Sequence, residues 1–459
     1  MNRRNFVKSA TAIAALGAVG IEHADCVDKR KTIKSFRITA TGSDFEREPL
    51  IRKVGFKGNY LSELWQSAVM LQGDSGIRKT GVSTQSVLWS DAEVFAANSE
   101  PAGNALMFAL TERALQMIKG QTFDSPLDIV ENIMEELTDY GRKITGNPHL
   151  RKTFILNALV SVDNAAWLLY AAENGVKTFD NLIPPAYRTA LSRHHNKVAA
   201  IPLISYNVPI DEIIRITDDG YFFLKIKIGQ AGTQEEMLQK DMERLSEIRK
   251  AIGNRTTPHT KSGKLLYYLD ANGRYEKKET LQRLIDHAKK IGAFDQIAII
   301  EEPFPETNEE DVSDLEPIIA ADESAHTDAD ALKRIEAGYR AIALKAIAKT
   351  MSMTMKIAQT AHKHKVACFC ADLTVNPLLL EWNKNVAARL LPFPGLEMGL
   401  LETNGSQNYR NWDNMSTYSP SYGMPWTKIN NGVFLLNEEY YSRSGGIFEP
   451  SQHYDDWFK

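Results

Sequence analysis

From residue 201 onward, hydrophobic residues occur in short continuous runs that alternate with amphipathic stretches. Such runs are typical of parallel strands that are buried on both faces. Eight strands closing a small barrel would fit this pattern, whereas an open doubly wound sheet would gather its ligand at one switch point. Polar residues follow five of the runs, which favours the barrel. The eight predicted strands are Ile201–Asn207, Phe222–Ile228, Leu265–Asp270, Ile297–Glu301, Ile318–Asp322, Ala341–Lys345, Val366–Cys370 and Leu396–Leu401.

Amphipathic helices are predicted between these strands. The clearest one, Thr233–Ile252, begins with a capping box and ends before Gly253. The repetition of strand and helix predicts a parallel α/β sheet.

The pattern outside this region is less regular. Ser35–Ala40 alternates like a strand, and Phe154–Asn174 is predicted as a long apolar helix. After Leu401 the periodicity weakens, and Val433–Leu436 is predicted as a short strand that returns to the first region.

Three acidic residues, Asp270, Glu301 and Asp322, stand at the ends of three successive predicted strands. Charge is costly inside a buried strand, but the C-terminal mouth of a barrel is where its chemistry lies. Three hard oxygen ligands completed by water suit Mg²⁺ better than Zn²⁺. The spacing therefore predicts a magnesium site, and the alternative is that single members of the set cap helices or lie at the surface.

Three lysines flank these acids. Lys225 and Lys227 are two positions apart on one strand, so their side chains share a face. We expect neighbouring ammonium groups to lower each other's pKa, which favours a general base. Lys345, on a strand further round, would face them across the barrel mouth. The alternative is that Lys225 and Lys345 are ion-pair partners of the acids.

Lysines on both sides of a metal predict a definite reaction. The metal would hold a substrate carboxylate and stabilise the enolate that forms when the α-proton leaves. One lysine would take the proton from one face, and the other would return it on the opposite face.

These motifs resemble the enolase superfamily and, within it, the muconate-lactonizing subgroup that includes the dipeptide epimerases. The resemblance covers about residues 34–449. Its strong motifs are Lys225-Ile226-Lys227-Ile228-Gly229, Leu269-Asp270-Ala271-Asn272-Gly273, Ile300-Glu301-Glu302-Pro303, Ala321-Asp322-Glu323-Ser324 and Ala343-Leu344-Lys345. A weaker one is Val162-Asp163-Asn164-Ala165-Ala166-Trp167, which is similar to the helix that links cap to barrel.

The resemblance implies an α/β fold: a modified TIM barrel, (β/α)7β, under an α+β capping domain that the N-terminal part and the C-terminal tail form together. The implied parts are the capping domain at 31–190, the barrel at 191–405 and a returning C-terminal segment at 406–459, and they follow a Tat-type export signal that the N-terminal residues themselves predict at 1–30.

The resemblance also implies the roles of the site residues. Mg²⁺, one ion per subunit, would be held by the three acids, and Mn²⁺ can take its place. Lys227 and Lys345 would be the acid/base pair, with Lys225 assisting. Asn272 and Glu323 would orient the ligands and the lysines.

The sequence departs from this family at three places. Lys349-Thr350-Met351-Ser352 stands where a Gly-Gly is usual after the second lysine, and Trp167 is followed by Leu168 instead of Asp. The Asp-x-Asp that holds a dipeptide's ammonium group is absent from the last strand. Glu402 is expected to supply one substrate-binding carboxylate, and Asp372 on the preceding strand is a second candidate.

Three functions follow as hypotheses. The first is a Mg²⁺-dependent racemase or epimerase that abstracts the proton α to a carboxylate, on a dipeptide or an amino-acid derivative. The second is a lyase or cycloisomerase that uses the same site, as in dehydratases, o-succinylbenzoate synthases and muconate cycloisomerases. The third is a non-catalytic relative that binds metal or carboxylates.

Composition changes this picture little. The chain has 459 residues, a formal net charge of −4 and three cysteines, which excludes a disulfide framework and gives no reason to expect nucleic acid as a partner. The expected partner is a small carboxylate, and a homo-oligomer is compatible with the sequence. Arg3 and Arg4 before the apolar stretch Ala10–Ile21 predict twin-arginine export to the periplasm, with no stable membrane span afterwards.

Overall fold

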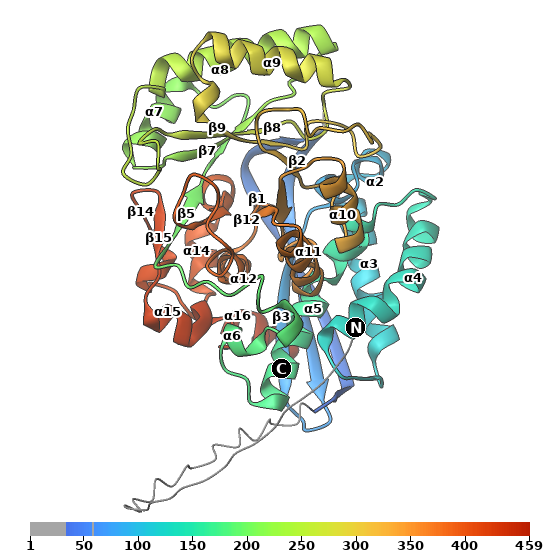
Figure 1. Cartoon of the computed structure of the whole chain (residues 1–459). Coiled ribbons are helices and arrows are strands. Elements are labelled where there is room, and N and C mark those ends of the chain that lie inside the picture. Colours follow the sequence, from blue (N-terminus) through green and yellow to red (C-terminus); the bar gives the residue numbers. More distant parts are fainter. Residues whose placement is uncertain (1–33, 57–58) are drawn as a thin grey trace, which may run out of the picture. The chain divides into compact units, whose positions relative to one another are not determined.

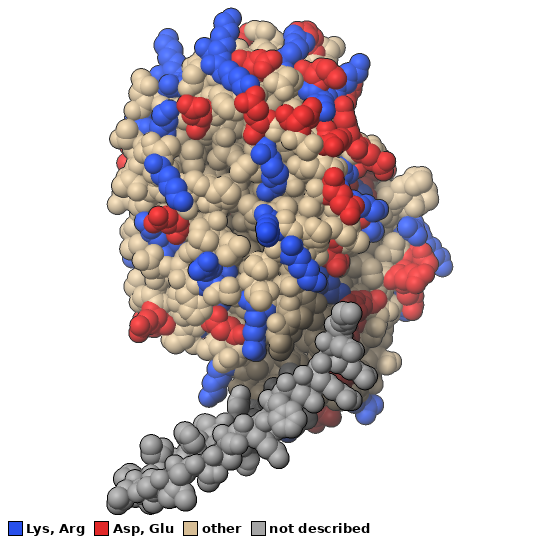
Figure 2. Space-filling view, viewed as in Figure 1, with Lys and Arg blue, Asp and Glu red and all other residues tan. Residues whose placement is uncertain are grey.

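The computed structural model describes residues 34–56 and 59–459. The predicted export signal at 1–30 lies outside the described residues. The described chain forms one compact unit, and the space-filling view shows acidic and basic side chains mixed over the visible face (Figure 2).

The N-terminal part is built on a four-stranded antiparallel sheet in the order β3-β2-β1-β4. Two long strands make most of it, and a β-bulge interrupts their pairing after Pro49. The predicted strand Ser35–Ala40 is thus the start of a much longer one. The strands are β1 (Phe36–Phe56), β2 (Asn59–Gly73), β3 (Arg78–Gln85) and β4 (Thr122–Phe123).

Helices complete this capping region around one buried helix. The helices are α1 (Val87–Ser90), α2 (Ala92–Ala97), α3 (Glu100–Ile118), α4 (Pro126–Thr145), α5 (Lys152–Asn174) and α6 (Phe179–Leu182), followed by the 3-10 turn η1 (Pro185–Tyr187). By length and composition α5 could cross a bilayer, but its apolar window is entirely buried within the protein. It is apolar on all sides because it is surrounded by protein.

The barrel consists of parallel strands, and its first strand is split by Pro202 into β5 and β6. β5 pairs with β13 and β6 pairs with β7, so the two halves close the barrel (Figure 1). Pro202 has no N–H to give to the ladder, but its carbonyl accepts a hydrogen bond from Lys225 N at 3.1 Å. The strands are β5 (Lys197–Ile201), β6 (Leu203–Ile204), β7 (Phe223–Lys227), β8 (Leu266–Asp270), β9 (Ile297–Glu301), β10 (Ile319–Ala321), β11 (Ala341–Leu344), β12 (Ala367–Cys370) and β13 (Gly399–Glu402).

Helices follow most of these strands on the outside of the barrel. They are α7 (Ile210–Asp218), α8 (Gln234–Ile252), α9 (Lys278–Lys290), α10 (Asp328–Glu336), α11 (Met351–Lys363) and α12 (Pro377–Ala387), with the 3-10 turn η2 (Phe294–Gln296) before β9. The connection from β9 to β10, residues 302–318, is fully described and contains no helix. The eight predicted barrel strands are found, and the first one begins four residues earlier than predicted.

The C-terminal segment corrects one prediction. Val433–Leu436 is expected from the sequence to return to the first region, but β15 (Val433–Leu435) pairs antiparallel with β5 of the barrel. That edge of β5 is open because only β6 reaches β7. The segment contacts the capping sheet on either side of β15: Tyr409 forms an antiparallel bridge with Leu50, and Tyr454 packs against Ala68 and Val82. The other elements of this segment are α13 (Gly405–Asn408), α14 (Trp412–Thr417), η3 (Pro425–Thr427), β14 (Ile429–Asn430), α15 (Glu438–Arg443), η4 (Ser444–Gly446), α16 (Gln452–Asp455) and η5 (Asp456–Phe458).

Candidate active site

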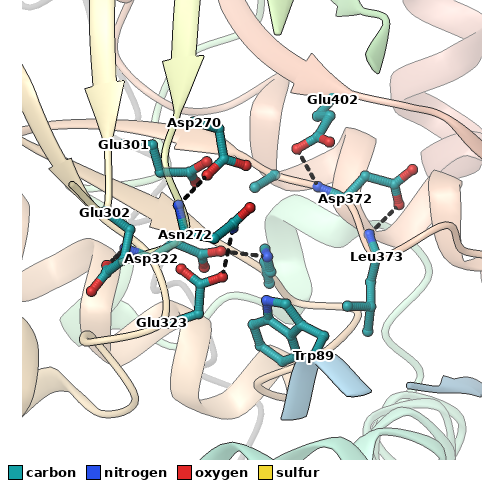
Figure 3. Close-up of polar contacts among 12 residues, drawn as sticks. Trp89, Asp270, Asn272, Glu301, Glu302, Asp322, Glu323, Asp372, Leu373 and Glu402 are labelled. Carbon is teal, nitrogen blue, oxygen red and sulfur yellow. Dashed lines mark hydrogen bonds and ion pairs between the residues drawn. The ribbon is translucent and has the colours of Figure 1, made fainter. Parts of the chain in front are cut away.

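The register of three neighbouring strands brings the predicted site residues together. Lys227 on β7 lies opposite Asp270 on β8, and Asp270 lies opposite Glu301 on β9. Asp322 follows β10 directly, and Lys345 follows β11. Because the C-terminal ends of parallel strands meet at one mouth of the barrel, all five side chains lie at the same end of it. Figure 3 shows the acidic members of this group.

Asp270 is shared by two lysines. Its Oδ2 lies 2.6 Å from Lys227 Nζ and 3.0 Å from Lys225 Nζ. Lys225 Nζ also lies 2.9 Å from Glu301 Oε2 and 3.0 Å from Glu402 Oε2. The two lysines therefore share a face, as the alternation of side chains along the strand predicts.

The expected lowering of the Lys225 pKa is wrong. Burial does oppose its charged form, but Asp270, Glu301 and Glu402 outweigh burial and raise the Lys225 pKa well above its usual value. The sequence shows only the neighbouring Lys227, whereas in the structure three carboxylates contact the Lys225 ammonium group. Lys225 is therefore held as a cation by its ion pairs.

Asn272 and Glu323 connect the two sides of the site. Lys227 Nζ donates to Asn272 Oδ1 at 2.5 Å, and Asn272 Nδ2 donates to Glu323 Oε1 at 3.0 Å. Asn272 has a φ of 46°, a left-handed conformation that asparagine tolerates better than most residues. This turn directs the amide toward Lys227 and Glu323 at once, so both residues lie where the sequence predicts supporting groups.

The far side of the site is organised around Asp322. Lys345 Nζ donates to Asp322 Oδ2 at 2.5 Å and lies 4.2 Å from the ring centroid of Trp89, which comes from α1 of the cap. Burial opposes ionisation of Asp322, but Lys345 and Lys349 lower its pKa to about 2. Asp322 is therefore an anion between two ammonium groups.

The three acids fit a divalent cation. Burial and the neighbouring Asp270 raise the pKa of Glu301 well above its usual value, and neither Glu301 oxygen receives a well-aligned hydrogen bond. A buried carboxylate with this need for positive charge, between two others, suits a hard cation with oxygen ligands. Among the described residues, no three acidic, histidine or cysteine side chains already form a closed metal-binding group. Asp270 and Asp322 each contact a lysine.

Glu402 and Asp372, the predicted substrate-binding carboxylates, both lie at the site but are already engaged. Glu402 Oε2 contacts Lys225 and accepts a hydrogen bond from Asp372 N, and Oε1 accepts one from Asn404. Asp372 accepts backbone hydrogen bonds from Leu373, from residue 375 and from Asn404. Burial, with Glu402 nearby, raises the Asp372 pKa to about 7.

Most of these residues line a cavity between the cap and the barrel mouth. The part of its wall that comes from the cap is uncharged and mostly apolar, since it consists of Leu50, Leu61, Leu64, Ser86 and Trp89. Every charged side chain among the described lining residues comes from the barrel. The barrel side of the cavity thus carries the charged side chains, and the cap side is mostly apolar.

Comparison with known proteins agrees with this geometry. Residues 210–399 match the family model described as enolase C-terminal domain-like. The matched residues make up most of the barrel. No curated protein matches the sequence.

Solved structures share the fold across most of the chain. A dipeptide epimerase from Enterococcus faecalis V583, complexed with Mg and the dipeptide L-Leu-L-Tyr, is 17% identical and has a TM-score of 0.56, with 80% of this chain and 90% of that chain covered. A mandelate racemase/muconate lactonizing protein from Herpetosiphon aurantiacus is 15% identical with a TM-score of 0.59, covering 87% and 96%. An N-succinyl Arg/Lys racemase from Bacillus cereus ATCC 14579 is 15% identical with a TM-score of 0.58, covering 82% and 89%.

The chain therefore has the fold expected from its sequence, an α/β barrel of the enolase type under a capping domain. Two contacts join cap and enolase-like barrel beside the site. Trp167 Nε1 on α5 donates to Ser352 Oγ at 3.0 Å, and Ser352 N donates to Asp163 at 3.1 Å. Asp163 belongs to the motif expected to link cap and barrel, and Ser352 lies in the first turn of the helix that follows Lys345.

Two residues that contact Asp322, Lys349 and Glu302, are not predicted from the sequence. Lys349 stands out in the sequence only as a departure from Gly-Gly, yet its ammonium group contacts Asp322. Its spacing of four residues from Lys345 is the available signal. Glu302 stands out only as part of a motif, yet its carboxylate accepts hydrogen bonds from Asp322 N at 2.8 Å and Ser324 Oγ at 3.0 Å. Nothing in the sequence distinguishes this buried acid from a surface one.

Proposed function

We propose that the protein is a Mg²⁺-dependent racemase or epimerase that exchanges the proton α to a carboxylate. The observation that carries the proposal is the placement of Lys227 and Lys345. They lie on β7 and after β11, four strands apart in the sheet order, and each contacts a different member of one group of three acids. A substrate carbon above these acids would have an ammonium or amine group on either face.

The residues have distinct roles in this reaction. Asp270, Glu301 and Asp322 would hold the cation, whose charge stabilises an enolate when it is bound. Lys227 removes the α-proton on one face, and Lys345 delivers a proton to the other face, so the configuration inverts. The reverse reaction exchanges their roles. Asn272 orients Lys227, and Trp89 covers Lys345 from the cap.

The cavity supports a substrate whose remote part is uncharged. The carboxylate end would face the lysines, and the rest would extend under Leu50, Leu61, Leu64 and Trp89. Burial of apolar substrate surface there contributes about 25 cal/mol per Å². Glu402 and Asp372 are occupied by internal contacts, which disfavours a free ammonium group. An N-acylated amino acid or a dipeptide derivative with an apolar side chain fits this wall, and structural neighbours named as a dipeptide epimerase and an N-succinyl Arg/Lys racemase support amino-acid derivatives as the class.

The test is proton NMR of the protein with Mg²⁺ in D₂O, using a panel of N-acylated amino acids and dipeptides. The expected result is deuterium entering the α-position of otherwise unchanged substrate, with both configurations appearing and EDTA stopping the exchange. Loss of water or ring closure would identify the lyase or cycloisomerase instead. Absence of any exchange, together with absence of Mg²⁺ binding in calorimetry, would contradict the proposal and leave a non-catalytic carboxylate-binding protein.

Export through the twin-arginine route to the periplasm also remains a proposal. Arg3 and Arg4 in the N-terminal segment support it. Cell fractionation of the full chain and of an Arg3→Lys, Arg4→Lys variant tests it, and an equal distribution of both proteins would contradict it.

A further inference from the structure

Lys349 is a fully buried lysine beside the site, with none of its side chain exposed. Its ammonium group has three oxygen partners. Nζ donates to the backbone carbonyl of Asp322 at 2.6 Å, to Asp322 Oδ1 at 3.2 Å and to the carbonyl of Ala325 at 3.0 Å. One side chain thus binds the carboxylate of Asp322, its backbone and the turn that follows it.

The two carboxylate oxygens of Asp322 are divided between two lysines. Oδ1 contacts Lys349, and Oδ2 contacts Lys345. A carboxylate held at both oxygens and at its own backbone has little freedom to rotate. We propose that Lys349 is a positioning residue that fixes Asp322 in the orientation needed to hold the divalent cation, and this inference rests on the proposed magnesium site.

The backbone next to Lys349 supports a specific role. Thr350 has φ 69° and ψ 154°, a conformation that is essentially restricted to glycine and that costs about 1–3 kcal/mol in other residues. Such strain persists only where the surroundings determine the conformation. Here Thr350 Oγ1 caps α11 through Met353 N at 3.1 Å, and Lys349 N donates to the carbonyl of Lys345 at 2.7 Å. The chain therefore keeps a strained turn that directs Lys349 inward.

The two possible roles of Lys349, charge balance and positioning, predict opposite effects of its removal on Mg²⁺ binding. If Lys349 only neutralised Asp322, its removal would leave more negative charge and Mg²⁺ would bind more tightly. If Lys349 positions Asp322, its removal frees the carboxylate to turn, and Mg²⁺ binds more weakly. The direction of the change therefore separates the two roles.

The matched control is Lys384, which is also fully buried. Its Nζ donates to Glu381 Oε1 at 2.6 Å and to the carbonyl of Trp426 at 2.9 Å. Like Lys349, it binds one carboxylate and backbone oxygen, but its partners are not among the residues that line the site cavity. Lys384→Met thus reports what removal of any buried lysine does to the protein.

The experiment is a calorimetric titration of the full-length protein with Mg²⁺ alone, after circular dichroism has shown that each variant is folded. Lys349→Met is expected to weaken binding about 10- to 100-fold, the range seen when groups supporting a metal ligand are lost. Lys384→Met is expected to bind like the wild type. Lys349→Gln, which keeps an N–H donor for the carbonyls, serves if the methionine variant does not fold, and it should also weaken binding.

Unchanged or tighter Mg²⁺ binding by a folded Lys349 variant would overturn this inference while leaving the proposed function intact. Equal weakening in Lys384→Met would also overturn it, because the effect would then be general. If the wild type itself binds no Mg²⁺, the proposed magnesium site fails, and the two failures are thus distinguishable.

Discussion

Asp270 and Asp322, the acids on the two sides of the site, contact their lysines in different ways. On the β7 side, a single oxygen of Asp270 serves both Lys225 and Lys227. On the β11 side, Asp322 gives one oxygen to Lys345 and the other to Lys349. Asp270 Oδ1 accepts a hydrogen bond from Asn272 N at 3.1 Å, whereas both oxygens of Asp322 contact lysines. Two lysines thus contact one oxygen of Asp270, which we call the shared anchor. One lysine contacts each oxygen of Asp322, which we call the clamped acid.

The lysines differ in the same way. Lys227 is 13% exposed and donates to the neutral amide of Asn272, while Lys345 is 3% exposed and lies against Trp89. Lys227 is thus the more accessible to a substrate, and Lys345 is enclosed by the cap. Proton exchange on the Lys345 face should depend on the cap more than exchange on the Lys227 face does.

The largest expected effect comes from removing the shared anchor. Asp270→Asn takes a ligand from the metal and the common partner from two lysines, so Mg²⁺ binding should weaken by more than about 100-fold, beyond the range for supporting groups. Calorimetry measures it. Asp241→Asn is the control, because Asp241 is equally buried but binds Gly229 N and the Tyr275 hydroxyl. Wild-type affinity in Asp270→Asn would show that Asp270 is not a ligand.

The stability of the protein is also expected to depend on pH through Asp163, which lies at the contact between cap and barrel. Burial raises the Asp163 pKa to about 6, against hydrogen bonds from Ser352 that lower it. Folding therefore favours the protonated acid. The stability this contributes is fully present below the unfolded pKa of about 4 and is lost as pH rises through about 6, a loss of about 3 kcal/mol.

Asp163→Asn should remove this dependence. Urea unfolding of both proteins between pH 4 and pH 7 measures it, and the difference in unfolding free energy between variant and wild type should grow with pH. Parallel profiles would contradict the assigned pKa.

A smaller effect is expected when the ion pair between Lys225 on β7 and Glu402 on β13 is broken. Glu402→Gln keeps the shape but removes one of the three charges that hold Lys225, so the protein should lose about 2 kcal/mol of stability. Glu439→Gln, which breaks an exposed pair with Arg443, should cost less than about 1 kcal/mol. Denaturant unfolding compares them, and equal losses would mean that Glu402 is not essential to the β7 side.

The smallest effect is expected from substitutions of Thr350, in the turn next to Lys349. Thr350→Ala loses the helix cap and keeps the strain, whereas Thr350→Gly loses the cap and relieves the strain. Thr350 is the N-cap of α11, where glycine is already preferred over alanine, so with the strain relieved as well the glycine variant should be more stable than the alanine variant by more than about 1 kcal/mol. Thermal unfolding measures the difference, and a difference no larger than the ordinary N-cap preference of about 1 kcal/mol would show that Thr350 is not strained.

The barrel can be predicted from the sequence because its signals are local. Five of the eight predicted strands are apolar runs followed by charged residues, so the amino-acid sequence alone places Asp270, Glu301 and Asp322 at the mouth. The register of the strands then follows from parallel pairing, and it brings Lys227 beside Asp270.

The remaining features depend on contacts between distant parts of the chain. The Lys225 pKa is set by carboxylates on β8, β9 and β13, and the sequence shows only the neighbouring lysine. Trp89 reaches Lys345 from the cap, which has no strong periodicity. Lys349 points inward next to Thr350, whose backbone conformation no propensity for threonine predicts.

The most direct test of the central claim follows each face of the substrate separately. With a substrate found in the D₂O panel, the single enantiomers are incubated with Lys227→Ala and with Lys345→Ala in the presence of Mg²⁺, and α-deuterium is followed by NMR. Each variant should lose exchange of one enantiomer by at least about 100-fold and retain exchange of the other, with the two variants affecting opposite enantiomers. Loss of the same enantiomer in both variants, or full exchange of both enantiomers in either one, would contradict two lysines acting on opposite faces.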